Sequence, residues 1–180
     1  KLKKTINKYD VIFVWVGITK KKNSNSADLS QVYSAAKEIS KSVNKFKIII
    51  TKSTVPVTTG DEIQKILSKK VKKDKFSVVS NPEFLREGEA IRDFVFPDRI
   101  VIGSNDNKSK IVLKNLYTPL ISKGAKFVSV NRRAAELIKY AANAFLATKI
   151  TFINEIANLC EKTAINVEDI SIGIGLDKRI

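Results

Sequence analysis

The most constraining feature of the sequence is a regular alternation of short apolar runs with segments of helical periodicity. Nearly continuous apolar runs cover residues 10–17, 46–52 and 76–80. Such runs are typical of parallel strands that are covered on both faces. Residues 27–43 and 60–67, which lie between these runs, place apolar side chains at helical spacing. The alternation predicts a doubly wound, Rossmann-like α/β fold with a parallel sheet and right-handed crossovers.

The pattern continues and then changes to a sustained helix. Strands are predicted at residues 99–103 and 127–130, with a helix over residues 108–120 between them. From residue 132 to about residue 162 the chain contains neither Gly nor Pro. A helix of that length would span roughly 45 Å at about 1.5 Å per residue, which suits a connector between domains.

We therefore predict two domains. Residues 1–130 would form the second half of a nucleotide-binding sheet domain, and residues 131–180 would form part of an all-α domain that begins with the connector helix. A further short helix is predicted to begin with residues 167–172.

The net charge of +15 raises the question of a polyanionic partner. Only six of the 33 basic residues are arginine, and the lysines are dispersed without interleaved aromatic residues. This favours a solvated surface over a nucleic-acid interface. No apolar run reaches the roughly 18 residues of a membrane span, so no membrane partner is predicted. One cysteine and no histidine argue against a disulfide framework, a zinc site or a His-based triad, and they suit a reducing, cytoplasmic location.

One motif bears directly on chemistry, the octet Asn81-Pro82-Glu83-Phe84-Leu85-Arg86-Glu87-Gly88. Its two glutamates, Glu83 and Glu87, are one helical turn apart, and they follow an apolar strand. Burying carboxylates at the end of a strand costs free energy, and such costs usually mark a site. The structural alternative is a helix that begins at Pro82 and places Glu83 near its amino-terminal dipole.

Two other segments carry candidate polar groups. Ser53, Thr54 and Val55 follow the strand at residues 46–52, where doubly wound folds collect ligand contacts, although an ordinary capped turn would have the same composition. Lys139 and Asn143 are four residues apart and share one face of the long helix. A lysine among apolar neighbours can stabilise a developing oxyanion, whereas an ordinary lysine is exposed to solvent.

The segments at residues 51–60, 81–88 and 134–149, in this order along the chain, resemble the nucleotide-sugar dehydrogenases of the UDP-glucose/GDP-mannose dehydrogenase family, and most closely the members that oxidise UDP-glucose. The resemblance runs from about residue 10 to the last residue and includes Pro97-Asp98-Arg99 and the ending Leu176-Asp177-Lys178-Arg179. It implies NAD as cofactor and UDP-glucose as substrate, with two successive hydride transfers that give UDP-glucuronate. It also implies a homodimer formed through the long helix at residues 132–162.

The resemblance further implies roles for individual residues. Glu83 would be the general acid/base, Thr54 would help to order a water, and Lys139 and Asn143 would stabilise developing negative charge. Substrate contacts would come from Glu83, Phe84, Leu85, Arg86, Glu87, Lys139 and Asn143. Cofactor contacts would come from Val16, Gly17, Ser53, Thr54, Val55 and Glu87. No metal is expected.

The chain also departs from the family pattern. It has no Gly-x-Gly-x-x-Gly segment, so it is expected to enter the fold at the fourth strand. The family's nucleophilic cysteine lies in a Gly-Gly-Ser-Cys segment, which this sequence lacks, and Cys160 sits in an apolar helical stripe that favours a core position.

A first residue of Lys and the absence of Met suggest an interior piece, and the isolated chain is predicted to be inactive. Trp15 and Ile18-Thr19 also replace a small residue and a Thr-Pro pair in the loop expected to contact the cofactor.

Three alternatives remain open at the level of the sequence. One is a sister enzyme that acts on GDP-mannose or UDP-N-acetylmannosamine. The others are a non-catalytic dimerising remnant and a polyanion binder, whose affinity should fall steeply with salt.

Overall fold

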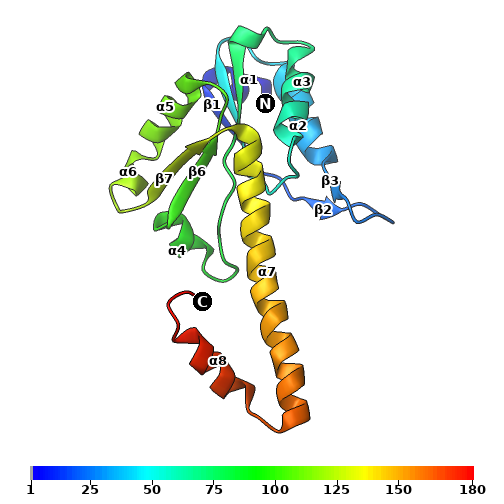
Figure 1. The fold of residues 1–180 in the computed structure, drawn as a ribbon. Coiled ribbons are helices and arrows are strands. Elements are labelled where there is room, and N and C mark those ends of the chain that lie inside the picture. The colour runs from blue at the N-terminus through cyan, green and yellow to red at the C-terminus, as the bar shows by residue number, and fades with distance from the viewer. Residues whose placement is uncertain (1) are drawn as a thin grey trace. The chain divides into compact units, whose positions relative to one another are not determined.

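The computed structural model describes residues 2–180, with side chains from residue 5 onward (Figure 1). The chain forms two compact units. The first unit is Lys1–Tyr140 and the second is Ala141–Ile180. The long helix α7 (Arg132–Thr163) belongs to both. The predicted helix over residues 132–162 agrees with it to within one residue.

The first unit is built on a five-stranded sheet in the order β1-β4-β5-β6-β7. The strands are β1 (Val11–Val14), β4 (Lys47–Thr51), β5 (Phe76–Ser80), β6 (Arg99–Gly103) and β7 (Lys126–Val130). The helices around the sheet are α1 (Leu2–Lys8), α2 (Ser30–Ser40), α3 (Thr59–Ser68), α4 (Ala90–Val95), α5 (Asn107–Leu116) and α6 (Thr118–Ile121), with one 3₁₀ turn at Lys73–Lys75. A separate two-residue hairpin pairs β2 (Thr19–Lys20) with β3 (Ala27–Asp28).

The predicted α/β class with a parallel sheet is confirmed, and one strand pairing within the sheet is antiparallel. Strands β1, β4 and β5 are parallel, and β6 and β7 are parallel to each other. Strand β6 pairs with β5 in the antiparallel sense through the single residue pair Ser80–Gly103. The reason is that residues 81–98 do not cross back over the sheet. Strand β6 starts at the edge where β5 ends and runs in the opposite direction.

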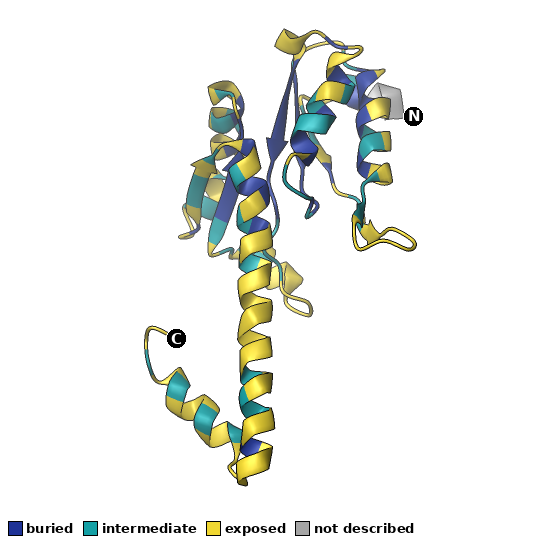
Figure 2. Ribbon diagram, turned by 45° about the vertical axis from the view of Figure 1, so that its right-hand side comes forward, coloured by how far each residue is buried: buried dark blue, intermediate teal, exposed yellow. Residues whose placement is uncertain are grey.

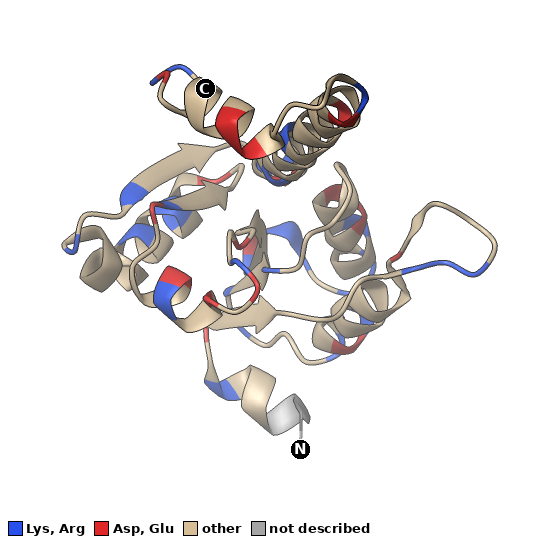
Figure 3. Ribbon diagram, turned by 90° about the horizontal axis from the view of Figure 1, so that it is seen from below, with Lys and Arg blue, Asp and Glu red and all other residues tan. Residues whose placement is uncertain are grey.

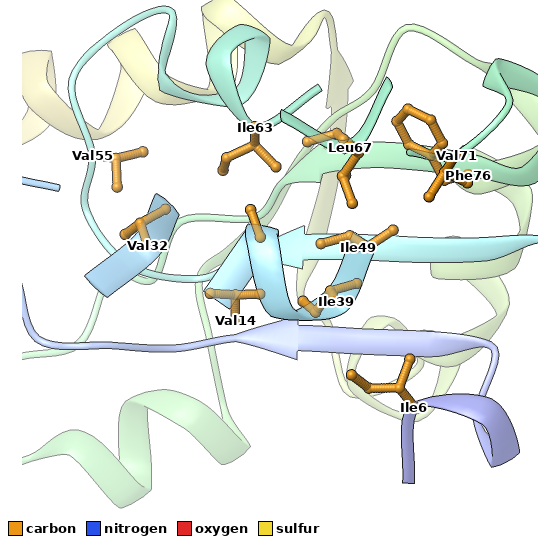
Figure 4. Close-up of a cluster of buried hydrophobic side chains, with 12 residues drawn as sticks. Ile6, Val14, Val32, Ile39, Ile49, Val55, Ile63, Leu67, Val71 and Phe76 are labelled. Carbon is orange, nitrogen blue, oxygen red and sulfur yellow. The ribbon is translucent and has the colours of Figure 1, made fainter. Parts of the chain in front are cut away.

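The central strands β4 and β5 are buried at every residue, as their unbroken apolar runs predicted, whereas the edge strand β1 is only partly buried (Figure 2). Ile49 and Val78 point to one face, where they pack with Ile63 of α3 and other side chains of α2 and α3 (Figure 4). Ile48, Ile50 and Val79 point to the opposite face, and Leu113 of α5 belongs to the same cluster. Alternate residues of each strand therefore supply two cores, and the central strands are held rigidly between them.

The amino-terminal helix α1 is fastened to the sheet by a buried lysine. Lys47 of β4 is fully buried, and its Nζ donates a hydrogen bond to Tyr9 O, just after α1, at 2.8 Å. An ammonium at the carboxyl end of a helix interacts favourably with the helix dipole. Neither α1 nor the β2–β3 hairpin was predicted from the sequence.

The start of α7 is attached to the amino end of α3 by hydrogen bonds and an ion pair. The Glu136 carboxylate accepts hydrogen bonds from Thr58 N and Gly60 N, both at 2.8 Å. Arg132 is 4% exposed and forms an ion pair with Asp61 in the first turn of α3. Negative charge at the amino end of α3 is favourable because the free N–H groups there carry the positive end of the dipole.

The second unit consists of the remainder of α7 and α8 (Val167–Gly175). Ala164 adopts a positive φ of 53° where α7 ends, and Asn166 Oδ1 accepts a hydrogen bond from Glu168 N at the start of α8. Cys160 is 5% exposed, in agreement with its predicted core position. Within residues 2–180, none of the helices combines the length and apolarity that crossing a membrane requires.

Candidate functional site

The loops that follow β1, β4 and β5 meet at one edge of the sheet, because these three strands are parallel. The first two loops are joined by Ser53. Its hydroxyl donates to Val16 O at 2.7 Å and accepts from Val16 N at 2.9 Å. Both hydrogen bonds of the Ser53 hydroxyl are therefore made to the backbone of Val16, and they connect the loop after β4 to the loop after β1.

The other residues predicted to contact the cofactor differ in their accessibility. Val55 is 3% exposed and belongs to the core, so its side chain faces away from solvent. Val16 also packs against that core and is half-buried, as is Thr54. Gly17 is exposed, and a Cβ there would meet nothing within 4 Å.

The octet after β5 is an extended loop rather than a helix. Residues 81–86 have no regular secondary structure, residues 87–88 form a turn with Gly88 at φ 83°, and α4 begins only at Ala90. The prediction that Glu83 and Glu87 stand one helical turn apart and are both buried is therefore wrong. Glu87 is exposed, whereas Glu83 is half-buried and points one carboxylate oxygen inward.

Glu83 and Lys139 come together although they are 56 residues apart in sequence. Lys139 is 9% exposed, and its Nζ lies 5.1 Å from the centre of the Phe84 ring. The Arg99 guanidinium lies 4.0 Å from the centre of the same ring. Burial lowers the pKa of the Lys139 ammonium, the Glu83 carboxylate opposes that shift, and Arg99 adds to it. The low exposure confirms the dry setting that the apolar neighbours of Lys139 predicted.

Glu83 Oε2 is buried and has no hydrogen-bond partner among the described residues. A buried carboxylate oxygen without a partner is costly, and such groups occur at sites that receive a ligand or perform chemistry. We define the Glu83 cluster as Lys52, Asn81, Glu83, Phe84, Arg99 and Lys139. All six residues lie in the first unit.

The remaining predicted site residues lie outside this cluster. Arg86 is exposed and paired with Asp93, with its NH2 2.7 Å from Asp93 Oδ1. Leu85 is half-buried. Asn143 is exposed, one turn beyond Lys139 on α7, and belongs to the second unit.

Three members of the cluster were not predicted: Lys52, Asn81 and Arg99. The apolar pattern predicts that Lys52 is the last residue of a buried strand, and a lysine at that position is itself a signal of a site. Trp15, which departs from the family pattern, is 54% exposed beside this edge. Within residues 5–180, no three His, Cys, Asp or Glu side chains gather as metal ligands would.

Comparison with known proteins decides the family. Residues 1–121 match the NAD binding domain of the UDP-glucose/GDP-mannose dehydrogenase family, and residues 133–180 match the central domain of the same family. The chain belongs to the UDP-glucose/GDP-mannose dehydrogenase family. The resemblance predicted from the sequence is thereby confirmed, and NAD is the cofactor that this family binds.

Curated members of the UDP-glucose/GDP-mannose dehydrogenase family agree with this assignment. The UDP-glucose 6-dehydrogenase of Rhizobium meliloti (strain 1021) is 52% identical over 181 residues, covering 99% of this chain and 41% of the relative. That of Rickettsia prowazekii is 52% identical over 172 residues, covering 96% of this chain and 39% of the relative. The chain thus spans about two-fifths of the length of the relatives it matches.

Solved structures of the family have the same fold. A UDP-glucose dehydrogenase of Pyrobaculum islandicum superposes with a TM-score of 0.93 at 36% identity, covering 100% of this chain and 42% of that one. A GDP-mannose dehydrogenase of Pseudomonas aeruginosa superposes with a TM-score of 0.89 at 32% identity, covering 99% and 42%.

Proposed function

We propose that this chain is part of a UDP-glucose 6-dehydrogenase, which oxidises UDP-glucose to UDP-glucuronate with NAD. The observation that carries the proposal is the juxtaposition of Lys139 with Glu83 at the edge of the sheet where the β1, β4 and β5 loops meet. The chain's 52% identity to enzymes of that name supports the choice of substrate.

The residues at this edge of the sheet would contact one side of the bound dinucleotide. The exposed Gly17 leaves open space beside β1, and the half-buried Thr54 follows β4. Ser53 would support the cofactor indirectly, because its hydroxyl is engaged by Val16. Val55 would contribute its backbone alone, since its side chain is in the core. Bound NAD would accept the hydride in each oxidation step.

The chemistry would be performed by the Lys139–Glu83 pair. Lys139 is desolvated, so its ammonium would stabilise negative charge that develops on a substrate oxygen more strongly than an exposed lysine would. Glu83 presents a carboxylate oxygen that has no hydrogen-bond partner among the described residues, and this oxygen would accept a proton and return it. Asn143 and Thr54 would hold a hydroxyl group and a water, and residues 84–87 would line the substrate.

A chimera tests the proposal. The 181-residue segment of the Rhizobium meliloti enzyme that matches this chain is replaced by the chain itself. The chimera should form two NADH per UDP-glucose, and it should turn over GDP-mannose and UDP-N-acetylmannosamine far more slowly. Substituting Lys139→Met should lower kcat by roughly 100-fold or more, the usual range for a lost acid–base or oxyanion group. A folded chimera that binds NAD but oxidises none of the three sugars would refute the function.

The isolated 180-residue chain should not turn over. Its only cysteine, Cys160, is buried, and the sequence contains no Gly-x-Gly-x-x-Gly segment. Covalent catalysis needs an accessible thiolate. Incubation with NAD and UDP-glucose should therefore yield no NADH, with the full-length Rhizobium meliloti enzyme as positive control. Any steady NADH formation would contradict this expectation.

We further propose that the full protein is a homodimer through α7. Phe145, Phe152 and Leu159 recur every seven residues on α7 and are 54–66% exposed. Residues at that spacing lie on one face of a helix, and an apolar stripe left in water favours association with a second copy.

A further inference from the structure

Lys52 is a buried cation to which the roles above assign nothing. It follows the last residue of β4 and is 7% exposed. Its Nζ donates a hydrogen bond to Asn81 Oδ1 at 3.4 Å and lies 6.0 Å from the centre of the Trp15 ring. Within the described residues, no carboxylate lies at ion-pair distance from it. Burying an ammonium with such weak partners is costly, so its place at this edge calls for an explanation.

The partner of Lys52 is itself held rigidly. Asn81 is 2% exposed, and its Nδ2 donates to Val101 O at 2.9 Å. That bond fixes which end of the amide carries the oxygen. Asn81 Oδ1 then accepts hydrogen bonds from both Lys52 Nζ and the hydroxyl of Tyr117. The ammonium of Lys52 is therefore directed toward a fixed amide oxygen at the carboxyl end of β4.

Both buried lysines contact residues that flank Glu83: Lys52 Nζ lies 3.4 Å from Asn81 Oδ1, and Lys139 Nζ lies 5.1 Å from the centre of the Phe84 ring. Burial lowers the pKa of Lys52, and the Glu83 carboxylate opposes this shift. The same carboxylate opposes the shift at Lys139. Glu83 thus interacts with two ammonium groups, one just after β4 and one on α7, while its buried Oε2 bonds to neither.

We propose that Lys52 is a positioning residue for Glu83, one of two ammonium groups that attract and orient this carboxylate while one of its oxygens stays free for the substrate. The positioning role rests on the function proposed above, whereas the pairing of two ammonium groups with one carboxylate does not. Two cations at a distance offset the cost of burying the carboxylate without occupying the oxygen that would exchange a proton.

The pairing is tested on this chain alone. The ¹³Cε resonances of the lysines are followed through a pH titration in the parent and in Glu83→Gln, which removes the charge and keeps the shape. The pKa of Lys52 and that of Lys139 should both fall. In the control Glu62→Gln, which removes an exposed carboxylate paired with Lys65, neither should move. If Glu83→Gln does not fold, Glu83→Asp withdraws the charge by one methylene and should shift both lysines by less. An unmoved Lys52 in a folded Glu83 variant overturns the proposal.

The positioning role is tested in the chimera. Lys52→Met should lower kcat by roughly 10- to 100-fold, the range for a displaced catalytic group, and leave the KM for NAD within about twofold. Lys52→Arg, which keeps the charge, should recover most of the loss, and the surface control Lys65→Met should match the parent. A Lys52→Met chimera with a parental kcat overturns the positioning role. If the parent chimera itself has no turnover, the proposed function fails, and the titration still decides the pairing.

Discussion

At the scale of single residues, the loop after β5 is joined to α4 by the ion pair between Arg86 and Asp93. Asp93 accepts hydrogen bonds from Arg86 N at 2.8 Å, from Arg86 Nε at 3.0 Å and from Arg86 NH2 at 2.7 Å. These bonds stabilise the charged carboxylate and lower the pKa of Asp93 from 3.8 to about 2. The contribution of Asp93 to stability is therefore present above pH 3.8 and is lost as the pH falls toward 2.

Substituting Arg86→Gln should raise the pKa of Asp93 back toward 3.8, because the side-chain bonds and the charge of Arg86 are both lost. The measurement is the pH titration of the Asp93 carboxyl carbon by NMR. Arg92→Gln is the matched control, since Arg92 makes the smallest contribution to the shift, and it should move the pKa only slightly. Equal shifts in the two variants would show that net charge, rather than the Arg86 geometry, sets the value.

How much of the site could be predicted also differs from residue to residue. The dry environment of Lys139 was predicted because its neighbours on a single helix are apolar, and helical spacing can be read from sequence. The approach of Lys52 to Glu83 could not be predicted, because it depends on the register between β4 and β5 and on the orientation of the Asn81 amide. The spacing of Glu83 and Glu87 indicated a helical turn, but the chain stays extended there until the turn at Gly88.

At the scale of elements, the contact between β6 and the start of α7 depends on Gly103. A Cβ on Gly103 would lie 2.4 Å from Ala135 Cβ and 2.9 Å from Arg132 Cα. Gly103→Ala should therefore destabilise the first unit by about 1–3 kcal/mol, the usual cost of overpacking, as measured by urea denaturation. Gly17→Ala is the control, because its Cβ would meet nothing within 4 Å, and it should change stability by less than about 0.5 kcal/mol. Equal effects would mean that α7 shifts to accommodate the methyl group.

Helices and strands could be predicted from the sequence where one hydrophobic pattern continued over several residues. Strands β5 and β6 have the predicted bounds, because each is a five-residue run closed by polar residues or Gly. The β2–β3 hairpin was predicted as a loop, since its strands have two residues each and show no alternation. The direction of β6 relative to β5 could not be predicted either. Direction depends on where residues 81–98 take the chain, and the apolar pattern of a buried strand is the same either way.

At the scale of the whole molecule, the positive charge is spread over most elements rather than gathered on one (Figure 3). Binding to a polyanion should then be non-specific and sensitive to salt. Fluorescence anisotropy with a labelled oligonucleotide should give a Kd no tighter than about 1 µM at physiological salt, and binding should weaken steeply as salt is raised. Tighter binding that survives added salt would favour the polyanion binder over the dehydrogenase.

The oligomeric state is the property that the exposed face of α7 should decide. Phe145, Phe152 and Leu159 present an apolar stripe, and burying it against a second copy removes apolar area from water at about 25 cal/mol per Å². Light scattering during gel filtration should give twice the chain mass of 20.1 kDa. Phe152→Glu, which places a charge in the stripe, should give the monomer. Asn154→Glu adds the same charge to an exposed position on the opposite side of the helix and should leave the dimer intact. A dimer that persists in the Phe152→Glu variant would mean that the interface lies elsewhere on the chain. A parent chain that is monomeric would mean that another segment of the full-length protein covers the stripe.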